Sequence, residues 1–330
     1  MKKTLLWCLK VFVSGFLAFC FLTAFCMLYY NIPAHTESVS KATDHSWEHN
    51  KFYSRATEGF GWGKTNNEGY LNPYDYSKDD TIDILTMGSS HMEGFNVAYD
   101  KSTSAVLGAL LPDYTVYNIG VSDHSFLTCV DNLEAAIEKY KPTKYVVIET
   151  TKLTYKDEKL TEAIDGTVAE VGSGTSGIVG TLERIPLLRL LYSQMASYMR
   201  NTSTTTTSSN APATTINEDL YNELFVKMSS TVAKSGAKLI IVYHSNLKIN
   251  EDGSASILKD ESDVSVLFED MCNKNGILFL DMSDIFIKEY EENHVLPHGF
   301  ANSSVGSGHL NNNGHKMIAN AVYELVKEEK

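Results

Sequence analysis

The hydrophobic residues of this chain gather into short runs, and between the runs apolar positions recur at helical spacing. Five runs are rich in Val, Ile, Leu, Tyr and Phe and show little alternation with polar residues. This pattern is typical of strands that are buried on both faces of a parallel sheet. We predict strands at Ile82–Met87, Thr115–Ile119, Tyr145–Ile148, Leu239–Tyr243 and Ile277–Leu280.

Amphipathic helical patterns follow or precede these runs. In the last pattern Ile318, Ala321, Val322 and Leu325 fall on one face of a helix. Alternation of strands and helices predicts an α/β fold, a three-layer sandwich with a five-stranded parallel sheet and right-handed crossovers. The predicted helices span Ser104–Leu111, Phe126–Tyr140, Leu220–Val232, Val264–Cys272 and Lys316–Val326.

A longer apolar segment stands apart from this pattern. Val11–Tyr30 is uncharged and is long enough for a membrane-spanning helix, which takes about 20 residues. Lys2, Lys3 and Lys10 precede it and predict a cytoplasmic N-terminus by the positive-inside rule. A cleaved signal peptide is the alternative, but the segment has no convincing small-x-small cleavage site. We therefore expect residues 1–31 to be a single-pass transmembrane anchor in the cell membrane, with an extracytoplasmic domain after it.

The rest of the chain divides by composition. Residues 32–80 are polar and aromatic and predict an extracytoplasmic spacer that becomes an N-terminal arm packed on the α/β domain of residues 81–330. Residues 152–216 are too long for a simple crossover and read as an insertion. Within it, Ile185–Met199 has an amphipathic pattern that favours a lid or wall of the site. The Thr/Ser-rich tract 201–215 predicts a mobile surface loop.

Charge and cysteine usage exclude some classes of protein. The net charge of -13 argues against nucleic acid as a partner, because non-specific binding to it needs a cationic face. Only Cys129 and Cys272 lie outside the N-terminal apolar segment, so no disulfide framework is implied. The chain has no Walker loop, no dinucleotide fingerprint and no metal-ligand spacing. We therefore expect no cofactor and no metal.

Candidate chemistry lies where the predicted strands end. In parallel α/β sheets, ligands bind at the carboxyl ends of the strands. Gly88-Ser89-Ser90 follows the first strand, and Gly308-His309 precedes the last helix. A serine and a histidine on two loops over one sheet edge have the geometry of a nucleophile and its base. We predict that a serine of the first loop and a histidine of the second are catalytic.

Three sequence blocks carry a resemblance to a known family. Gly88-Ser89-Ser90-His91-Met92-Glu93-Gly94 matches Gly-Asp-Ser-x-x-x-Gly, with Ser89 in place of Asp. Asn118-Ile119-Gly120 matches a second block, and His309 matches the last one. In this order, over roughly residues 65–330, the chain resembles the SGNH/GDSL hydrolase superfamily. The resemblance implies a flavodoxin-like three-layer fold, catalytic roles for Ser90 as the nucleophile and His309 as its base, and an oxyanion hole that includes the N–H groups of Ser90 and Gly120.

The chain departs from the family pattern in its third block. The family has Gly-x-Asn-Asp, whose Asn side chain completes the oxyanion hole, whereas this chain has Glu149-Thr150-Thr151. A carboxylate repels an oxyanion, so we expect Thr150 or Thr151 to donate instead. Glu149, Thr151, His91 and His244 are further candidates for lining the site.

The acid of the triad is the second departure. In the family it stands three residues before the histidine, and that position is Gly306 here. His309 would then act in a Ser–His dyad, oriented by a backbone carbonyl or by a distant acid such as Asp284.

These observations predict a membrane-anchored serine esterase or O-acyltransferase. Its substrate would be an acylated glycan of the cell envelope or a small ester, cleaved through an acyl-enzyme. A catalytically impaired protein that binds glycans or serves as an assembly component is the alternative. A lipase or thioesterase acting on membrane lipids is a third possibility, and it would require an apolar groove.

Overall fold

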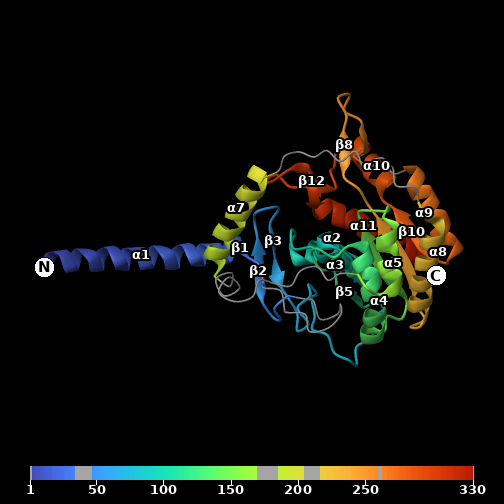
Figure 1. Cartoon of the computed structure of the whole chain (residues 1–330), viewed down its shortest axis with the longest axis horizontal. Coiled ribbons are helices and arrows are strands. Elements are labelled where there is room, and N and C mark those ends of the chain that lie inside the picture. The colour runs from blue at the N-terminus through green and yellow to red at the C-terminus, as the bar shows by residue number, and fades with distance from the viewer. Residues whose placement is uncertain (1, 34–46, 169–184, 204–215, 259–261, 330) are drawn as a thin grey trace.

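A parallel sheet of five strands forms the centre of the molecule (Figure 1). The computed structural model describes residues 2–33, 47–168, 185–203, 216–258 and 262–329. The sheet order β10-β7-β6-β4-β5 makes the first strand of the sheet a neighbour of both the second and the third, which is the flavodoxin-like order. All five predicted strands are present: β4 Ile84–Met87, β5 Val116–Asn118, β6 Tyr145–Thr150, β7 Lys238–Tyr243 and β10 Leu278–Asp281.

Helices cover both faces of the sheet, as predicted. Successive residues of a strand point to opposite faces, so each strand contributes apolar side chains to two separate cores. In β6, Val146 and Ile148 join one apolar cluster, whereas Tyr145 and Val147 join the other. The first cluster lies under α4 (Phe126–Tyr140), α5 (Asp157–Asp165), α8 (Glu218–Ala233) and α9 (Ser262–Lys274). The second lies under α3 (Thr103–Leu110), α10 (Ser283–Asn293) and α11 (Asn312–Glu328).

The N-terminal arm packs on this domain through a small antiparallel sheet. The sheet consists of β1 (Tyr30–Asn31), β2 (Phe52–Arg55) and β3 (Gly61–Lys64). Trp47, Tyr53 and Leu71 of the arm form an apolar cluster with Phe95 of the domain. The turn between β2 and β3 is thereby held against the α/β domain.

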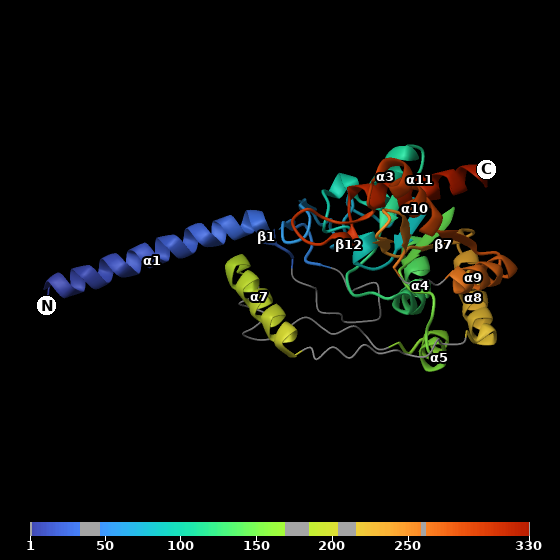
Figure 2. The ribbon, with the colours of Figure 1, turned by 90° about the horizontal axis from the view of Figure 1, so that it is seen from above.

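Helix α1 (Lys2–Tyr29) projects away from the body (Figures 1 and 2). Its segment Lys3–Tyr29 contains an 18-residue window with a mean hydropathy of 2.4, and in the described part of the chain α1 is the one helix long and apolar enough to cross a membrane. Helix α7 (Pro186–Ser203) forms where the amphipathic pattern of the insertion predicts a helix, and it contacts α1. Most of the Thr/Ser-rich tract lies outside the described residues.

Several short elements complete the domain. They connect or cap the longer elements: α2 (Ser90–Glu93), the 3-10 helix η1 (Tyr99–Lys101), the hairpin of β8 (Leu247–Ile249) and β9 (Ala255–Ile257), and the pair of β11 (His298–Gly299) and β12 (Val305–Leu310).

Candidate active site

The turn after β4 places Ser90 at the start of α2. Ser89 caps this helix, since its Oγ accepts the N–H of His91 at 3.3 Å. The turn is tight: a Cβ at Gly88 would lie 2.6 Å from Oε2 of Glu149 and 2.8 Å from Cβ of Met92. Glycine is therefore required at position 88 for the chain to pass so close to β6.

Ser90 and His309 are in hydrogen-bond contact. Oγ of Ser90 lies 2.9 Å from Nε2 of His309, although the two residues are 219 positions apart. His309 belongs to β12, whose partner β11 joins it through the pair His298 and Leu310. The His309 side chain is 25% exposed, so its ring is reachable from solvent. The fold therefore brings together the two residues that the sequence analysis predicts to be catalytic.

A third residue completes the arrangement from the opposite side of the imidazole ring. Nδ1 of His309 lies 2.7 Å from Oε2 of Glu58, and the backbone N–H of His309 donates to Oε1 of Glu58 at 3.0 Å. Burial raises the pKa of Glu58, but the hydrogen bonds from His309 and the charges of His309 and Arg55 outweigh burial and hold that pKa at about 2. An ionised Glu58 keeps a proton on Nδ1 and leaves the Nε2 lone pair facing Ser90.

Glu58 is the functional residue that the sequence analysis missed. It lies in the arm, in the turn between β2 and β3, whereas the family resemblance directs attention to residues just before His309. A backbone carbonyl or a distant acid such as Asp284 was expected to orient His309, but its Nδ1 is bonded to Glu58 instead. The one available signal was a carboxylate within the turn-rich segment Thr57-Glu58-Gly59-Phe60-Gly61, which specifies a turn but not its partner.

The predicted oxyanion donors are differently placed. The N–H of Ser90 lies in the first turn of α2, beside the nucleophile. The N–H of Gly120 donates to Oδ1 of Asn118 at 2.9 Å. The hydroxyl of Thr150 donates to the carbonyl of Lys152 at 2.8 Å, and Thr151 is exposed. In this structure the Gly120 and Thr150 groups are therefore engaged within their own loops.

Glu149 holds the turn between β4 and α2, which contains Gly88 and Ser89, in place. Its Oε2 accepts the N–H and the hydroxyl of Ser89, both at 2.9 Å, and its Oε1 lies 3.0 Å from Nε2 of His244. Burial raises the pKa of Glu149, but the bond to His244, the charges of His244 and His91, and the Ser89 N–H bring that pKa down to about 2. Glu149 and His244 are both buried, so they position the turn instead of contacting a substrate.

Comparison with known proteins gives matches among solved structures only. No family model and no curated protein matches the chain. LAE5, described as an alpha/beta hydrolase enzyme from the metagenome of Lake Arreo, Spain, is 15% identical over 76% of this chain and 98% of its own, with a TM-score of 0.43. TesA is 12% identical over 74% and 98%, with a TM-score of 0.41. A member of the lipolytic protein G-D-S-L family from Veillonella parvula is 13% identical over 74% and 98%, with a TM-score of 0.39.

A group of three histidines lies behind the nucleophile turn. Candidate ligand nitrogens of His91, His244 and His298 lie within 4.8 Å of one another. Nδ1 of His91 accepts the N–H of Leu310 at 3.2 Å, so a neutral His91 carries its proton on Nε2. Both nitrogens of His244 are also bonded, to Glu149 and, at 3.2 Å, to His298. A metal ion would have to displace these bonds, so the group fits a hydrogen-bonded support better than a metal cage.

Of the cavities, a small one borders the triad. It has a volume of about 400 Å³ and contacts Glu58 and Gly308, the neighbour of His309. Hydroxyl, amide and guanidinium groups contribute much of its lining: Tyr30, Arg55, Thr57, Gln194, Ser303, Ser304 and Ser307. A larger cavity of about 920 Å³ lies between the arm, η1 and α3. Ser90 and His309 line neither of these two cavities, and the smaller one reaches the site through Glu58.

Proposed function

We propose that this chain is a serine hydrolase of the SGNH/GDSL type, an esterase or O-acyltransferase held at the membrane by α1 with its α/β domain outside the cell. The observation that carries the proposal is the chain of contacts from Ser90 through His309 to Glu58. A hydroxyl, an imidazole and a carboxylate in this order form a proton-transfer relay for acyl transfer.

The proposed mechanism gives each group a role. Nε2 of His309 takes the hydroxyl proton as Oγ of Ser90 attacks the ester carbonyl. The resulting imidazolium is stabilised by Glu58 and gives its proton to the departing alkoxide, which leaves an acyl group on Ser90. A water molecule or an acceptor hydroxyl then attacks the acyl-enzyme while His309 again accepts the proton, and His309 returns that proton to Oγ of Ser90 as the bond between Oγ and the acyl group breaks. Water gives a free acid, and an acceptor hydroxyl gives a new ester.

For the substrate we propose ester-linked acyl groups of cell-envelope glycans, or small esters. The predicted topology exposes the site to the envelope, and the polar cavity beside Glu58 supports a hydroxyl-bearing ligand. Its three serines and Gln194 are side chains that exchange hydrogen bonds with sugar hydroxyls.

A second candidate function follows from the oxyanion donors. Because the N–H of Gly120 and the hydroxyl of Thr150 have internal partners, the site lacks two of its predicted donors as it stands. A protein that kept the fold and binds acylated glycans without cleaving them would tolerate this arrangement. It would bind its ligand and show no turnover.

Covalent labelling with a fluorophosphonate probe separates the two functions. We expect the full-length protein in detergent to be labelled, Ser90→Ala to remain unlabelled, and Ser89→Ala to be labelled because it retains the Ser90 hydroxyl. Hydrolysis of p-nitrophenyl acetate should follow the same order. A wild type that neither reacts with the probe nor hydrolyses the ester would remove the enzymatic proposal and leave the binding function.

A further inference from the structure

A third pocket lies at the point where α1 ends, with a volume of about 770 Å³. Ala24, Met27 and Leu28 come from the last turns of α1, Phe52 comes from β2, and Pro186 and Arg189 come from the start of α7. The segment that follows α1 and two charged residues complete the lining: Tyr30, Asn31, Ile32, Pro33, Glu48 and Lys51. If α1 crosses the bilayer, the α1 wall of this pocket lies at the level where the chain leaves the lipid.

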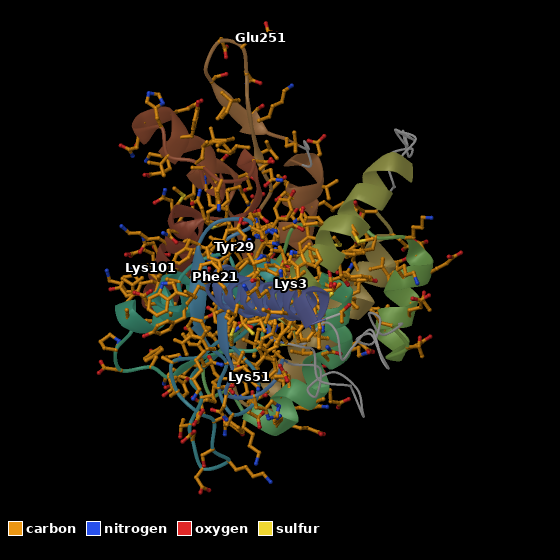
Figure 3. The ribbon with its side chains drawn as sticks, turned by 90° about the vertical axis from the view of Figure 1, so that its left-hand side faces the viewer. Lys3, Phe21, Tyr29, Lys51, Lys101 and Glu251 are labelled. Atoms are coloured by element: carbon orange, nitrogen blue, oxygen red, sulfur yellow. The ribbon has the colours of Figure 1, made fainter. Side chains whose placement is uncertain are left out.

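Helix α7 is fixed beside this exit. The guanidinium of Arg189 donates to the carbonyls of Ile32 and, at 3.2 Å, of Pro33, in the segment that directly follows α1. Figure 3 faces the end of the molecule from which α1 projects, and α7 crosses this face beside it.

The apolar side chains of α7 are not all covered by protein. Leu191 is 52% exposed, Tyr192 50% and Met195 60%. An amphipathic helix with exposed apolar and aromatic side chains, running across the axis of a membrane-spanning helix at its end, is suited to lie in the lipid interface. The outer wall of the pocket would then be continuous with the membrane surface.

The pocket also leads toward the triad. Tyr30 lines both the 770 Å³ pocket and the 400 Å³ cavity that Glu58 and Gly308 border. A ligand with its apolar part against α1 would therefore extend past Tyr30 toward Glu58, the carboxylate that contacts His309.

We propose that the pocket between α1, β2 and α7 binds the lipid part of a membrane-resident ester, so that the ester is drawn from the bilayer and presented to Ser90. This inference rests on the proposed function and names its substrate class, a lipid-linked ester. The apolar wall of α1 binds the chain, and the polar cavity beside Glu58 receives the head of the molecule.

Lipid contact is tested without catalysis. The full-length protein is placed in phosphatidylcholine nanodiscs with or without bromine atoms on the lipid acyl chains. Phe52 and Phe60 flank the β2–β3 turn and are both exposed, but only Phe52 lines the pocket. We expect the fluorescence that Phe52→Trp adds to the wild type to be quenched by brominated lipid, and that of Phe60→Trp to be unaffected. Equal quenching of the two variants, or none in Phe52→Trp, overturns the proposal.

Catalysis provides the second readout. Ala24→Phe fills the pocket, whereas Ala18→Phe adds the same side chain to α1 at a position that does not line it. We expect Ala24→Phe to lower the ratio of p-nitrophenyl palmitate turnover to p-nitrophenyl acetate turnover in nanodiscs by at least tenfold, and Ala18→Phe to keep the wild-type ratio. An Ala24→Phe variant that matches Ala18→Phe in this ratio contradicts the proposal. Failure of every variant on both esters would instead count against the proposed function, and the quenching result still decides lipid contact.

Discussion

Glu58 and His309 are joined by two hydrogen bonds across 251 positions of sequence. The carboxylate accepts from both the ring Nδ1 and the backbone N–H of His309, so it sets the orientation of the ring as well as its tautomer. In the proposed mechanism the N-terminal arm thus supplies the acid that orients His309, and the arm and the α/β domain must be assembled for the contacts from Ser90 to Glu58 to exist.

Replacing this acid should slow the enzyme without abolishing it. In Glu58→Gln the amide no longer stabilises an imidazolium and is able to select the wrong tautomer of His309. We expect kcat for p-nitrophenyl acetate to fall by about 10²–10⁴ with little change in KM. Asp284→Asn, which removes the acid that the sequence suggested, should stay within about threefold of the wild type. Wild-type kinetics in Glu58→Gln, or a large loss in Asp284→Asn, would refute the assignment.

Two glycines of β12 give a matched test of the same contact. Both have left-handed backbone, with φ of 96° at Gly308 and 81° at Gly306. A Cβ at Gly308 would lie 2.6 Å from Oε1 of Glu58, whereas one at Gly306 meets only a methyl group of Leu296, at 3.6 Å. Alanine at either position strains the backbone by about 1–2 kcal/mol. Only Gly308→Ala should also lower kcat, by tenfold or more, and steady-state kinetics of the two variants would show whether they differ.

Glu93 should make stability depend on pH in the direction opposite to most carboxylates. It is fully buried, accepts the Trp47 Nε1–H at 2.5 Å and bonds to the Ser122 hydroxyl. Burial raises the pKa of Glu93 to about 7, against the bonds from Ser122 and Trp47 and the charge of Arg55. The folded state therefore favours the protonated form, and the stability gained from it is full below about pH 4.3 and is lost as pH rises to about 7.

The variant Glu93→Gln stays neutral across this range. The free energies of unfolding of the two proteins are measured with urea in detergent. The value for Glu93→Gln minus the value for the wild type should increase by about 3 kcal/mol between pH 4 and 7. A difference between the two proteins that does not change with pH would show that Glu93 is not the group responsible.

Glu149 should matter for stability more than any surface carboxylate. Glu149→Gln replaces one carboxylate oxygen by an NH2 group, so the side chain no longer offers acceptor oxygens to both Ser89 and His244, and leaving such a buried group unpaired costs about 3 kcal/mol. We expect Tm to fall by roughly 10 °C. Glu162→Gln, which breaks the exposed pair with Lys159, should change Tm by no more than about 2 °C.

Acid titration adds a check on the same residue. Because the pKa of Glu149 is held at about 2, its contribution is present above the unfolded value of about 4.3 and is lost as pH falls toward 2. The acid-induced loss of stability should therefore be smaller in Glu149→Gln than in the wild type. The acid titrations of the two proteins are compared by circular dichroism. An equal loss of stability with falling pH in both proteins would disprove this account.

Local patterns were enough to predict the framework. The five strands and the helices α3, α4, α8, α9 and α11 follow from runs and periodicities that each lie within one stretch of chain. The helices α5 and α10 and the short hairpins were not predicted, because a pattern of a few residues is too weak to stand out. The β2–β3 hairpin is among them, and it carries the turn with Glu58.

The sequence by itself determined the order of strands and helices and the apolar segment at the N-terminus. It also determined that a serine and a histidine lie on two loops, and the parallel arrangement of the strands places both loops at the same edge of the sheet. Only the tertiary structure decided which carboxylate faces His309, where Glu149 points, and which groups satisfy Gly120 and Thr150. Secondary structure depends on periodicity among near neighbours, which a sequence displays directly. A hydrogen bond between side chains 251 positions apart depends on how the arm packs on the domain, and no local pattern encodes that contact.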